Sequence, residues 1–289
     1  MKYFSKILNE EIKISSLLAT NEKLEKTHES VAKYTITGLT LSPHKSSGIA
    51  NLCKDSTTGC RNSCVLEFAG RRVMESVRKA SRNRTALFFD DRKLFESLLL
   101  LELATEGVKA NHNEKLLLCR LNVASDLPWE RLCPGVFELP SVHRFYDYTA
   151  TYSRALQSLS WQLPYDLTFS VKETTTIEKT QTILNNGGNV AMVVDSLYQP
   201  AQKRFGCFPS WVQIGNKEYQ TVDGDIHDVR LRAVDGNGKV VLLRNKGTNA
   251  AKQNAIVSRF AHQLDLSKDY IADKPTTIDG LSRVEWIQA

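Results

Sequence analysis

The sequence predicts an α/β fold whose centre is a parallel sheet, formed either as an open doubly wound sheet or as a full or partial (β/α) barrel. Two observations lead to this prediction. Short apolar runs alternate with helical patterns along the chain, which is typical of repeated β-α-β units. Polar residues follow most of the apolar runs, as expected where the carboxyl ends of parallel strands form one rim. The second observation favours the barrel.

The strands are predicted from runs of β-branched, aliphatic and aromatic residues bounded by turn formers. The first run leads directly into Ser42 and Pro43, where the chain must leave the sheet. The runs are short and largely apolar, which is typical of parallel strands covered on both faces. In chain order the predicted strands are Tyr34–Leu41, Leu116–Leu121, His143–Tyr148, Asp166–Ser170, Asn189–Val194 and Lys239–Leu243.

Helical patterns separate several of these runs. Asp90 or Asp91 can cap the start of one helix, and Gly107 can end it. At the N-terminus, apolar residues mix with acids and lysines in a way that indicates a surface helix. Residues 235–238, Asp-Gly-Asn-Gly, predict a hairpin turn. The predicted helices cover about 65–80, 90–106, 153–158 and 176–185, besides the N-terminal one.

The chain divides into three predicted parts. Residues 1–30 form an N-terminal helical extension, 31–250 a single α/β barrel-like catalytic or binding domain, and 251–289 a C-terminal helix and tail. A composition of 42% hydrophobic and 24% charged residues over 289 positions excludes a disordered chain. No run approaches the length of a membrane span, and the first residues do not form an apolar export signal, so we expect a cytoplasmic protein without membrane contact.

Three of the six cysteines lie within one loop. Cys53, Cys60 and Cys64 are separated by six and then three residues. Thiolates bind soft and borderline metals, and a glycine-containing loop can bend around an ion or a cluster. Three cysteines suit a [4Fe-4S] cluster that leaves one iron open to another ligand. The sequence therefore predicts an iron–sulfur site here.

Other interpretations of the cysteine loop remain open. A structural zinc ion would need a fourth ligand, for which His44, Cys119, Cys133 or Cys207 is available. Three buried thiols could also simply pack as small apolar side chains. A disulfide framework is the least favoured alternative, because a chain of this size can bury a core without cross-links.

The ends of the predicted strands collect polar and titratable side chains. If the strands are parallel, these side chains share one rim with the cysteine loop, as expected for the mouth of an enzyme. Each of them alone has a structural alternative, such as a helix cap or a half-buried strand aromatic. The rim residues are Asn122, Ser125, Asp126, Glu130, Tyr146, Asp147, Ser170, Glu173, Asp223, Asp225 and Lys246.

A basic segment follows the cysteine loop directly. It contains six cations against one acid, Glu75, within a chain of net charge +6. The segment predicts either a solvated basic helix or a contact with phosphate, a nucleotide or nucleic acid. Its cations are Arg71, Arg72, Arg78, Lys79, Arg82 and Arg84.

Ordered blocks of this sequence resemble the phage gene-product-88 domain family. They cover about 35–247 and begin with the cysteine loop, although Lys54 stands where family members often have proline. The resemblance implies a phage protein acting in the host cytoplasm, but it implies no specific activity. The remaining blocks are AGR at 69–71, RTALFF at 84–89, RLNVASDLPWE at 120–130, FYDYT at 145–149, LTFSVKE at 167–173, DGDIHD at 223–228 and LRNKG at 243–247.

The placement of three cysteines after the first strand also resembles, more weakly, the radical S-adenosylmethionine enzymes and their barrel. Their usual spacing is three and then two residues, unlike the spacing here. The resemblance implies a cluster on Cys53, Cys60 and Cys64 that reductively cleaves S-adenosylmethionine. It further implies cofactor contacts at Asn122, Ser125, Asp126, Glu130 and Ser170, and substrate or proton-transfer roles for Tyr146, Asp147, Glu173, Asp223, Asp225 and Lys246.

Two other functions remain open at this point. The chain could be a nucleic-acid-binding or replication-associated phage protein in which a zinc or iron site only pins the loop. Alternatively, carboxylates of the rim could hold magnesium in a nuclease or phosphotransferase, with Asp126, Glu130, Asp223 and Asp225 as oxygen ligands.

Overall fold

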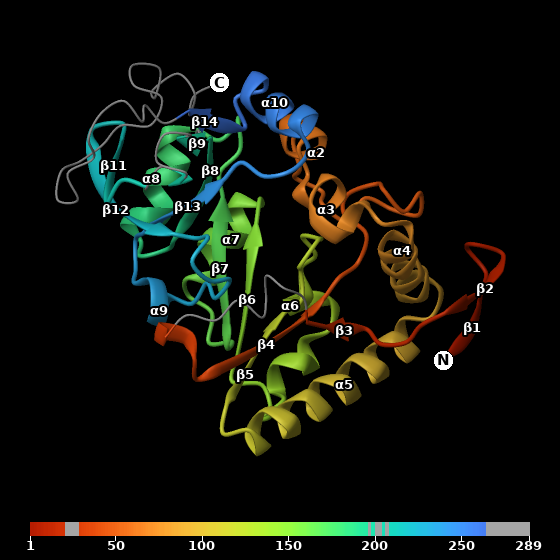
Figure 1. The fold of residues 1–289 in the computed structure, drawn as a ribbon. Coiled ribbons are helices and arrows are strands. Elements are labelled where there is room, and N and C mark those ends of the chain that lie inside the picture. The colour runs from red at the N-terminus through yellow and green to blue at the C-terminus, as the bar shows by residue number, and fades with distance from the viewer. Residues whose placement is uncertain (21–28, 196–197, 200–203, 206–207, 264–289) are drawn as a thin grey trace.

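The computed structural model of the chain describes residues 1–20, 29–195, 198–199, 204–205 and 208–263. Its centre is a sheet in the order β11-β12-β13-β8-β7-β6-β5-β4-β3, with β14 paired to β8 (Figure 1). These strands are β3 (Leu18–Ala19), β4 (Tyr34–Leu39), β5 (Leu116–Arg120), β6 (Arg144–Thr149), β7 (Tyr165–Ser170), β8 (Val190–Asp195), β11 (Trp211–Ile214), β12 (Lys217–Asp223), β13 (Val240–Arg244) and β14 (Ala261–Gln263).

The six predicted strands are confirmed within two residues at either end. They correspond to β4, β5, β6, β7, β8 and β13, and every neighbouring pair among them is parallel. Their apolar side chains are buried on both faces, which is why the runs are largely continuous in apolar character instead of alternating. Parallel pairing brings the carboxyl ends of all six strands to one edge of the sheet.

The sheet does not close into a barrel within the part of the chain that the structure describes. Strands β3 and β11 lie at its two ends and do not pair with each other. The two outermost strands pair antiparallel with their neighbours, β3 with β4 and β11 with β12. Each edge of the parallel part of the sheet is therefore covered by an antiparallel strand that is close to it in sequence. A full barrel is therefore wrong for these residues, and the likeness to a radical S-adenosylmethionine barrel is unconfirmed.

Helices cover one face of this sheet. Leu117 and Cys119 of β5 pack with Phe95, Leu99 and Leu103 in the main core, whereas Leu118 faces the other side. The helices among the described residues are α2 (Thr58–Asn62), α3 (Val65–Phe68), α4 (Glu75–Asp90), α5 (Arg92–His112), α6 (Trp129–Leu132), α7 (Tyr152–Ser158), α8 (Ile177–Asn185), α9 (Arg232–Asp235) and α10 (Asn249–Val257), with short 3-10 turns η1 (Glu29–Val31), η2 (Gly70–Val73) and η3 (Pro134–Glu138).

Helix α5 begins as predicted but continues past the expected stop. Asp91 caps it by accepting a hydrogen bond from the backbone N–H of Leu94 at 3.0 Å. Gly107 lies inside the helix, where a β-carbon would approach the backbone oxygen of Ser141 to 2.5 Å. This glycine thus permits close packing and does not end the helix.

The opposite face of the sheet is covered by the connection between β12 and β13. Val229 and Leu231 pack there against Tyr34, Leu118 and Tyr146. This connection contains α9 and joins two parallel strands, so the hairpin predicted at 235–238 is wrong. The glycines are still required, because Gly236 has a positive φ of 86° where α9 ends.

The N-terminal helix predicted for 1–30 is also wrong in its described part. Residues 2–13 form a hairpin of β1 (Lys2–Ser5) and β2 (Glu10–Lys13). Ile12 and Ile14 are buried and the lysine between them is exposed, which is the alternation of a strand. Asn9 takes a positive φ of 51° at the turn, a conformation that asparagine tolerates.

The predicted helix at 65–80 is divided into α3, η2 and the first residues of α4. Near the other end of the chain, α10 packs against α2, and Figure 1 shows these two helices side by side.

None of the described helices combines the length and apolar character that a membrane crossing requires. The predicted tail from residue 264 onward lies outside the described residues. A small hairpin of β9 (Tyr198–Gln199) and β10 (Arg204–Phe205) lies outside the main sheet.

Candidate functional site

The cysteine loop folds as two short helical turns. Thr57 caps α2, where its Oγ1 accepts a hydrogen bond from the backbone N–H of Cys60 at 3.3 Å. Cys64 lies between α2 and α3. The loop therefore presents Cys60 from α2 and Cys64 from the following bend, while Cys53 precedes both.

The three thiols are electrostatic neighbours. Burial raises the pKa of Cys53 to about 11, and a charge on Cys60 would raise it further. Burial likewise raises the pKa of Cys64 to about 12, with smaller contributions from Cys60, Glu67 and Cys53. All three are partly exposed free thiols. The thiols therefore influence one another electrostatically, and the predicted metal site on them stays a prediction.

The ends of β5, β6 and β7 anchor the loop. The thiol of Cys53 donates to the carbonyl of Ala124 at 3.6 Å, and its sulfur accepts from the backbone N–H of His44 at 3.3 Å. The side chain of Asp55 accepts a hydrogen bond from the hydroxyl of Thr151, which follows β6. Glu173, three residues beyond β7, binds the loop from a third strand end. The loop therefore lies on the predicted rim.

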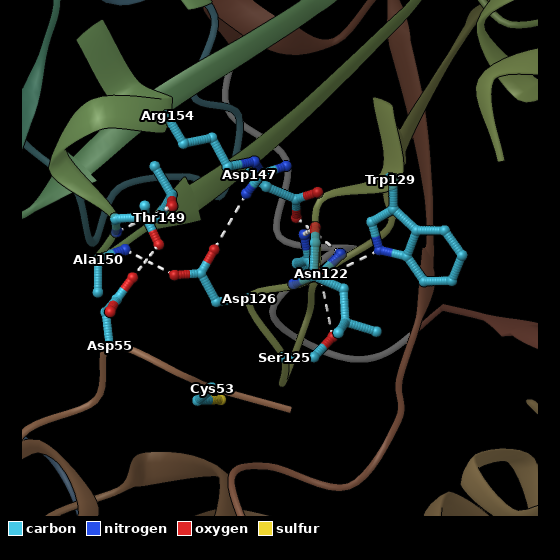
Figure 2. A network of polar contacts seen from close by, with 12 residues as sticks. Cys53, Asp55, Asn122, Ser125, Asp126, Trp129, Asp147, Thr149, Ala150 and Arg154 are labelled. Carbon is cyan, nitrogen blue, oxygen red and sulfur yellow. Dashed lines mark hydrogen bonds and ion pairs between the residues drawn. The ribbon is translucent and has the colours of Figure 1, made fainter. Parts of the chain in front are cut away.

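Asn122 and Ser125 organise the turn after β5. The Asn122 side-chain oxygen accepts hydrogen bonds from the hydroxyl of Ser125 at 2.8 Å, the backbone N–H of Leu127 at 2.9 Å and the indole of Trp129 at 3.0 Å. Its amide nitrogen donates to the Leu127 carbonyl. Figure 2 shows Cys53 near this turn. Both predicted cofactor residues are buried and engaged within the chain.

Asp126 and Glu130 share one cation, Arg154, which the sequence did not single out. Arg154 Nη1 lies 3.0 Å from Asp126 Oδ1, as Figure 2 shows. Its Nη2 lies 2.8 Å from Glu130 Oε2. Asp126 also accepts from the backbone N–H of Ala150 at 2.7 Å. Burial raises the pKa of Asp126, and Arg154 opposes that shift. No local pattern in α7 marks Arg154 as a buried partner, so only the fold reveals it.

Ser170 ends β7 and accepts a hydrogen bond from Lys172 Nζ at 2.8 Å. The charge of Lys172 acts on Cys53, whose pKa it lowers against the larger effect of burial. It acts in the same direction on Asp126. Lys172 is therefore a cation beside the cysteine loop that the sequence analysis missed.

Asp223, Asp225 and Lys246 form a second group at the ends of β12 and β13. Asp223 accepts from the backbone N–H of Asp225 at 2.8 Å, and Asp225 pairs with Arg244 at 3.3 Å and with Lys246. The chain after Lys246 returns to the cysteine region, because the backbone N–H of Thr248 donates to the carbonyl of Phe68. Among the described residues, no group of acids, histidines or cysteines is arranged to hold a single metal ion. The magnesium alternative has no support from this arrangement.

Tyr146 and Asp147 lie inside the sheet. Asp147 accepts hydrogen bonds from the backbone N–H groups of Leu121 and Asn122 and from the hydroxyl of Tyr165, at 2.8 to 3.1 Å. Burial raises the pKa of Asp147 to about 7, against the effect of the neighbouring Arg120. Tyr146 is fully buried. The predicted catalytic roles of this pair remain predictions, although both side chains face partners within the chain.

The face of the sheet that the β12–β13 connection covers carries buried charges that the sequence analysis missed. Arg120 Nη1 lies 2.7 Å from Asp228 Oδ2, and Arg230 Nη1 lies 3.3 Å from Asp235 Oδ1. Arg120 comes from β5, and the other three from the connection between β12 and β13. The Arg120–Asp228 pair fixes that connection to the sheet, and the Arg230–Asp235 pair lies within the connection. Their charged side chains stand in otherwise apolar runs, which is the one signal in the sequence that could have indicated them.

Asp235 gives the stability of the protein a predicted pH dependence. Burial raises the pKa of Asp235 from 3.8 to about 6, because Arg230 only partly offsets the loss of hydration. The folded chain then holds a proton that the unfolded chain has released, so stability falls as the pH rises through 6. From pH 5 to pH 7 we expect this group to cost about 1 kcal/mol.

Chemical denaturation at pH 5, 6, 7 and 8 tests this expectation. Asp235→Asn stays neutral throughout and should remove that part of the fall, so the difference between wild type and variant isolates this residue. Asp223→Asn, at the rim, serves as the control and should keep the wild-type slope. An Asp235→Asn slope equal to that of wild type would show that this carboxyl titrates alike in both states.

The cations of the basic segment lie in different environments. Arg82 pairs with Glu10 of the N-terminal hairpin at 3.1 Å, and Arg84 donates to the carbonyl of Ser16 at 2.8 Å. Arg78 donates to the carbonyl of Glu67, and Lys79 is exposed. The side chains of Arg71 and Arg72 lie outside the described residues. Contact with nucleic acid therefore stays a prediction, and two of its six cations hold the N-terminal hairpin instead.

Among the described residues, the proposed additional zinc ligands lie in different surroundings. Cys119 and Cys133 lie in the main apolar core. His44 Nε2 lies 2.8 Å from a carboxylate oxygen of Glu67. Cys207 lies outside the described residues. The described fourth ligands for zinc are thus either buried elsewhere or already bonded.

Comparison with known proteins gives one match. The family model described as Gene product 88 matches residues 15–259. No curated protein and no solved structure is similar enough to count as a match, so the weaker likeness to radical S-adenosylmethionine enzymes has no support there. The matched region includes the cysteine loop and every rim residue described above. The chain belongs to the phage gene product 88 family.

Proposed function

We propose that this phage protein binds a [4Fe-4S] cluster through Cys53, Cys60 and Cys64 and uses it in a radical S-adenosylmethionine-like reaction. The observation that carries the proposal is the position of three mutually neighbouring thiols over the carboxyl ends of parallel strands. This is the edge at which α/β folds bind their ligands. Thiolates are the ligands that hold iron–sulfur clusters.

The number of thiols favours a cluster over one zinc ion. A structural zinc ion takes four protein ligands, whereas the loop supplies three cysteines. In a four-iron cluster each thiolate binds a different iron, so three sulfurs spread over one loop suffice. The other two cysteines that the structure describes, Cys119 and Cys133, lie in the core.

Two groups favour the thiolate form of Cys53 against the larger effect of burial. The backbone N–H of His44 already donates to the sulfur of Cys53, a bond that is stronger to a thiolate than to a thiol. The charge of Lys172 favours the ionised form of the same residue. When bound, such a cluster supplies a low-potential electron, and its open iron can accept an amino acid chelate such as that of S-adenosylmethionine. Thr57, Gly59 and Glu173 hold the loop at the rim.

We expect anaerobically prepared protein to contain about four irons and four sulfides per chain. Cys60→Ala should lose the intact cluster, because it removes one of the three proposed ligands. The measurement is iron and sulfide analysis with electron paramagnetic resonance of the reduced protein. Cys133→Ala is the matched control, since it removes a thiol from the core and should keep the iron content.

Addition of S-adenosylmethionine tests the proposed reaction separately from binding of the cluster. A shift of the resonance spectrum that is absent with S-adenosylhomocysteine at equal concentration would support ligation at the open iron. An unchanged spectrum would leave an iron–sulfur protein without this reaction. One zinc per chain, or no bound metal after reconstitution, would overturn the proposal as a whole.

A further inference from the structure

Glu173 binds the cysteine loop with both of its carboxylate oxygens. Oε2 accepts a hydrogen bond from the hydroxyl of Thr57 at 2.7 Å, and Oε1 accepts from the backbone N–H of Gly59 at 2.8 Å. The two partners flank Thr58, immediately before Cys60. One side chain from the end of β7 therefore determines where the second cysteine of the loop lies.

The hydrogen bond between Glu173 and Thr57 also affects the position of Cys60. Because the Thr57 hydroxyl donates to Glu173, its oxygen lone pairs remain to accept the backbone N–H of Cys60 at 3.3 Å. The carboxylate thus orients the cap of the helix that carries the cysteine. A glutamine at this position keeps one acceptor oxygen for the Gly59 N–H, but its amide nitrogen can only donate to the Thr57 hydroxyl, so the hydrogen bond from that hydroxyl to a charged oxygen is lost.

Close packing at Gly59 completes the contact. A β-carbon at Gly59 would approach Oε1 of Glu173 to 2.7 Å and the hydroxyl oxygen of Ser258 to 2.5 Å. Ser258 follows α10, whose Asn254 side chain donates to the carbonyl of Asn62 at 3.5 Å. The turn that carries Cys60 is thus enclosed between the end of β7 and α10.

Cys53 is anchored independently of Glu173. Its sulfur contacts His44 and Ala124, and the backbone N–H of Asp126 donates to the carbonyl of Leu52 at 2.8 Å. One cysteine is therefore fixed by the end of β5, and another by the end of β7. The separation of the two sulfurs depends on both anchors.

We infer that Glu173 is a positioning residue that holds Cys60 at the distance from Cys53 required for ligation of the cluster, and that it is not an acid or base of the reaction. This inference rests on the proposed function. It assigns the carboxylate a role in assembly of the site, since both oxygens are occupied by the loop. A catalytic acid or base would need one oxygen directed toward substrate.

The first test uses the protein without metal. Glu173→Gln should raise the alkylation rate of Cys60 by iodoacetamide about tenfold, as expected when a hydrogen bond to a charged group no longer holds the loop closed. Cys53 should keep its wild-type rate. Thr57→Val should reproduce the effect from the loop side, and Thr57→Ser, which keeps the hydroxyl, should restore slow alkylation.

The second test uses reconstituted protein. Glu173→Gln should bind less iron than wild type and show an altered resonance spectrum, with a thermal transition close to that of wild type. Equal Cys60 alkylation in Glu173→Gln and wild type would overturn the inference, whatever the iron content. Failure of wild type to bind iron would overturn the proposed function, while the alkylation contrast would still decide whether Glu173 holds Cys60.

Discussion

Arg120→Met is expected to lower the free energy of unfolding by about 3 to 5 kcal/mol. The guanidinium is 5% exposed and lies between Asp228 and Asp147, whose side chains are fully buried. Methionine retains much of the stem but removes the positive charge. Two carboxylates from different parts of the chain would then be buried without their cation, which is far more costly than losing a surface ion pair.

The pKa of Arg120 supports this assignment. Burial alone would lower it, but Asp228, Tyr146 and Asp147 raise it above the ordinary value, so the charged form is held by its neighbours. Denaturant unfolding followed by circular dichroism measures the effect. Asp228 belongs to the connection between β12 and β13, which covers one face of the sheet. We therefore also expect this connection to become sensitive to protease in the variant.

Arg144→Met provides the matched control. Arg144 pairs with Asp166, but Asp166 also accepts a hydrogen bond from Arg232 at 2.9 Å, so it keeps one cation. The control should cost about 1 kcal/mol. The double variant Arg120→Met with Asp228→Leu should recover part of the loss, since it removes a buried charge together with its partner. A loss below about 1 kcal/mol for Arg120→Met would contradict a buried, ionised pair.

The features of the fold that could be predicted are those that depend on neighbouring residues in the sequence, such as strand positions and helix caps. The central strands are apolar and β-branched, and their positions follow from that composition; Asp91 also caps a helix as the pattern predicts. Closure of the sheet was not predictable, because strand order and curvature depend on contacts between distant residues. The N-terminal hairpin was missed because Ile7 and Leu8 extend the short alternation at 10–14 into a spacing that also fits a helix.

The candidate site shows the same division. Parallel strands oblige their carboxyl ends to meet, so the proximity of the cysteine loop to Asp126 and Glu173 could be predicted. The partner of each carboxylate could not, because Glu173 binds residues more than a hundred positions away. Arg154 and Lys172 were missed for the same reason. Residue type and strand end locate a site, whereas the partners of each side chain decide what that side chain can do.

Arg154→Met is expected to cost about 3 to 5 kcal/mol in the free energy of unfolding. The guanidinium is 7% exposed and binds Asp126 and Glu130, which are 10% and 7% exposed, and it also donates to the hydroxyl of Tyr165. Its removal leaves two largely buried carboxylates at the rim without the guanidinium that joins them. Denaturant unfolding measures the loss, and Arg154→Lys should be intermediate because lysine keeps the charge but not the forked geometry.

Magnesium distinguishes a structural from a metal-binding role for these carboxylates. In wild type the forked bond to Glu130 and the bond to Asp126 occupy the oxygens that a hard cation would need. We therefore expect magnesium to leave the thermal transition of wild type unchanged and to raise that of Arg154→Met, where both carboxylates have lost their cation. Stabilisation of wild type by magnesium, abolished by Asp126→Asn, would contradict this assignment and show that the rim takes a metal despite Arg154.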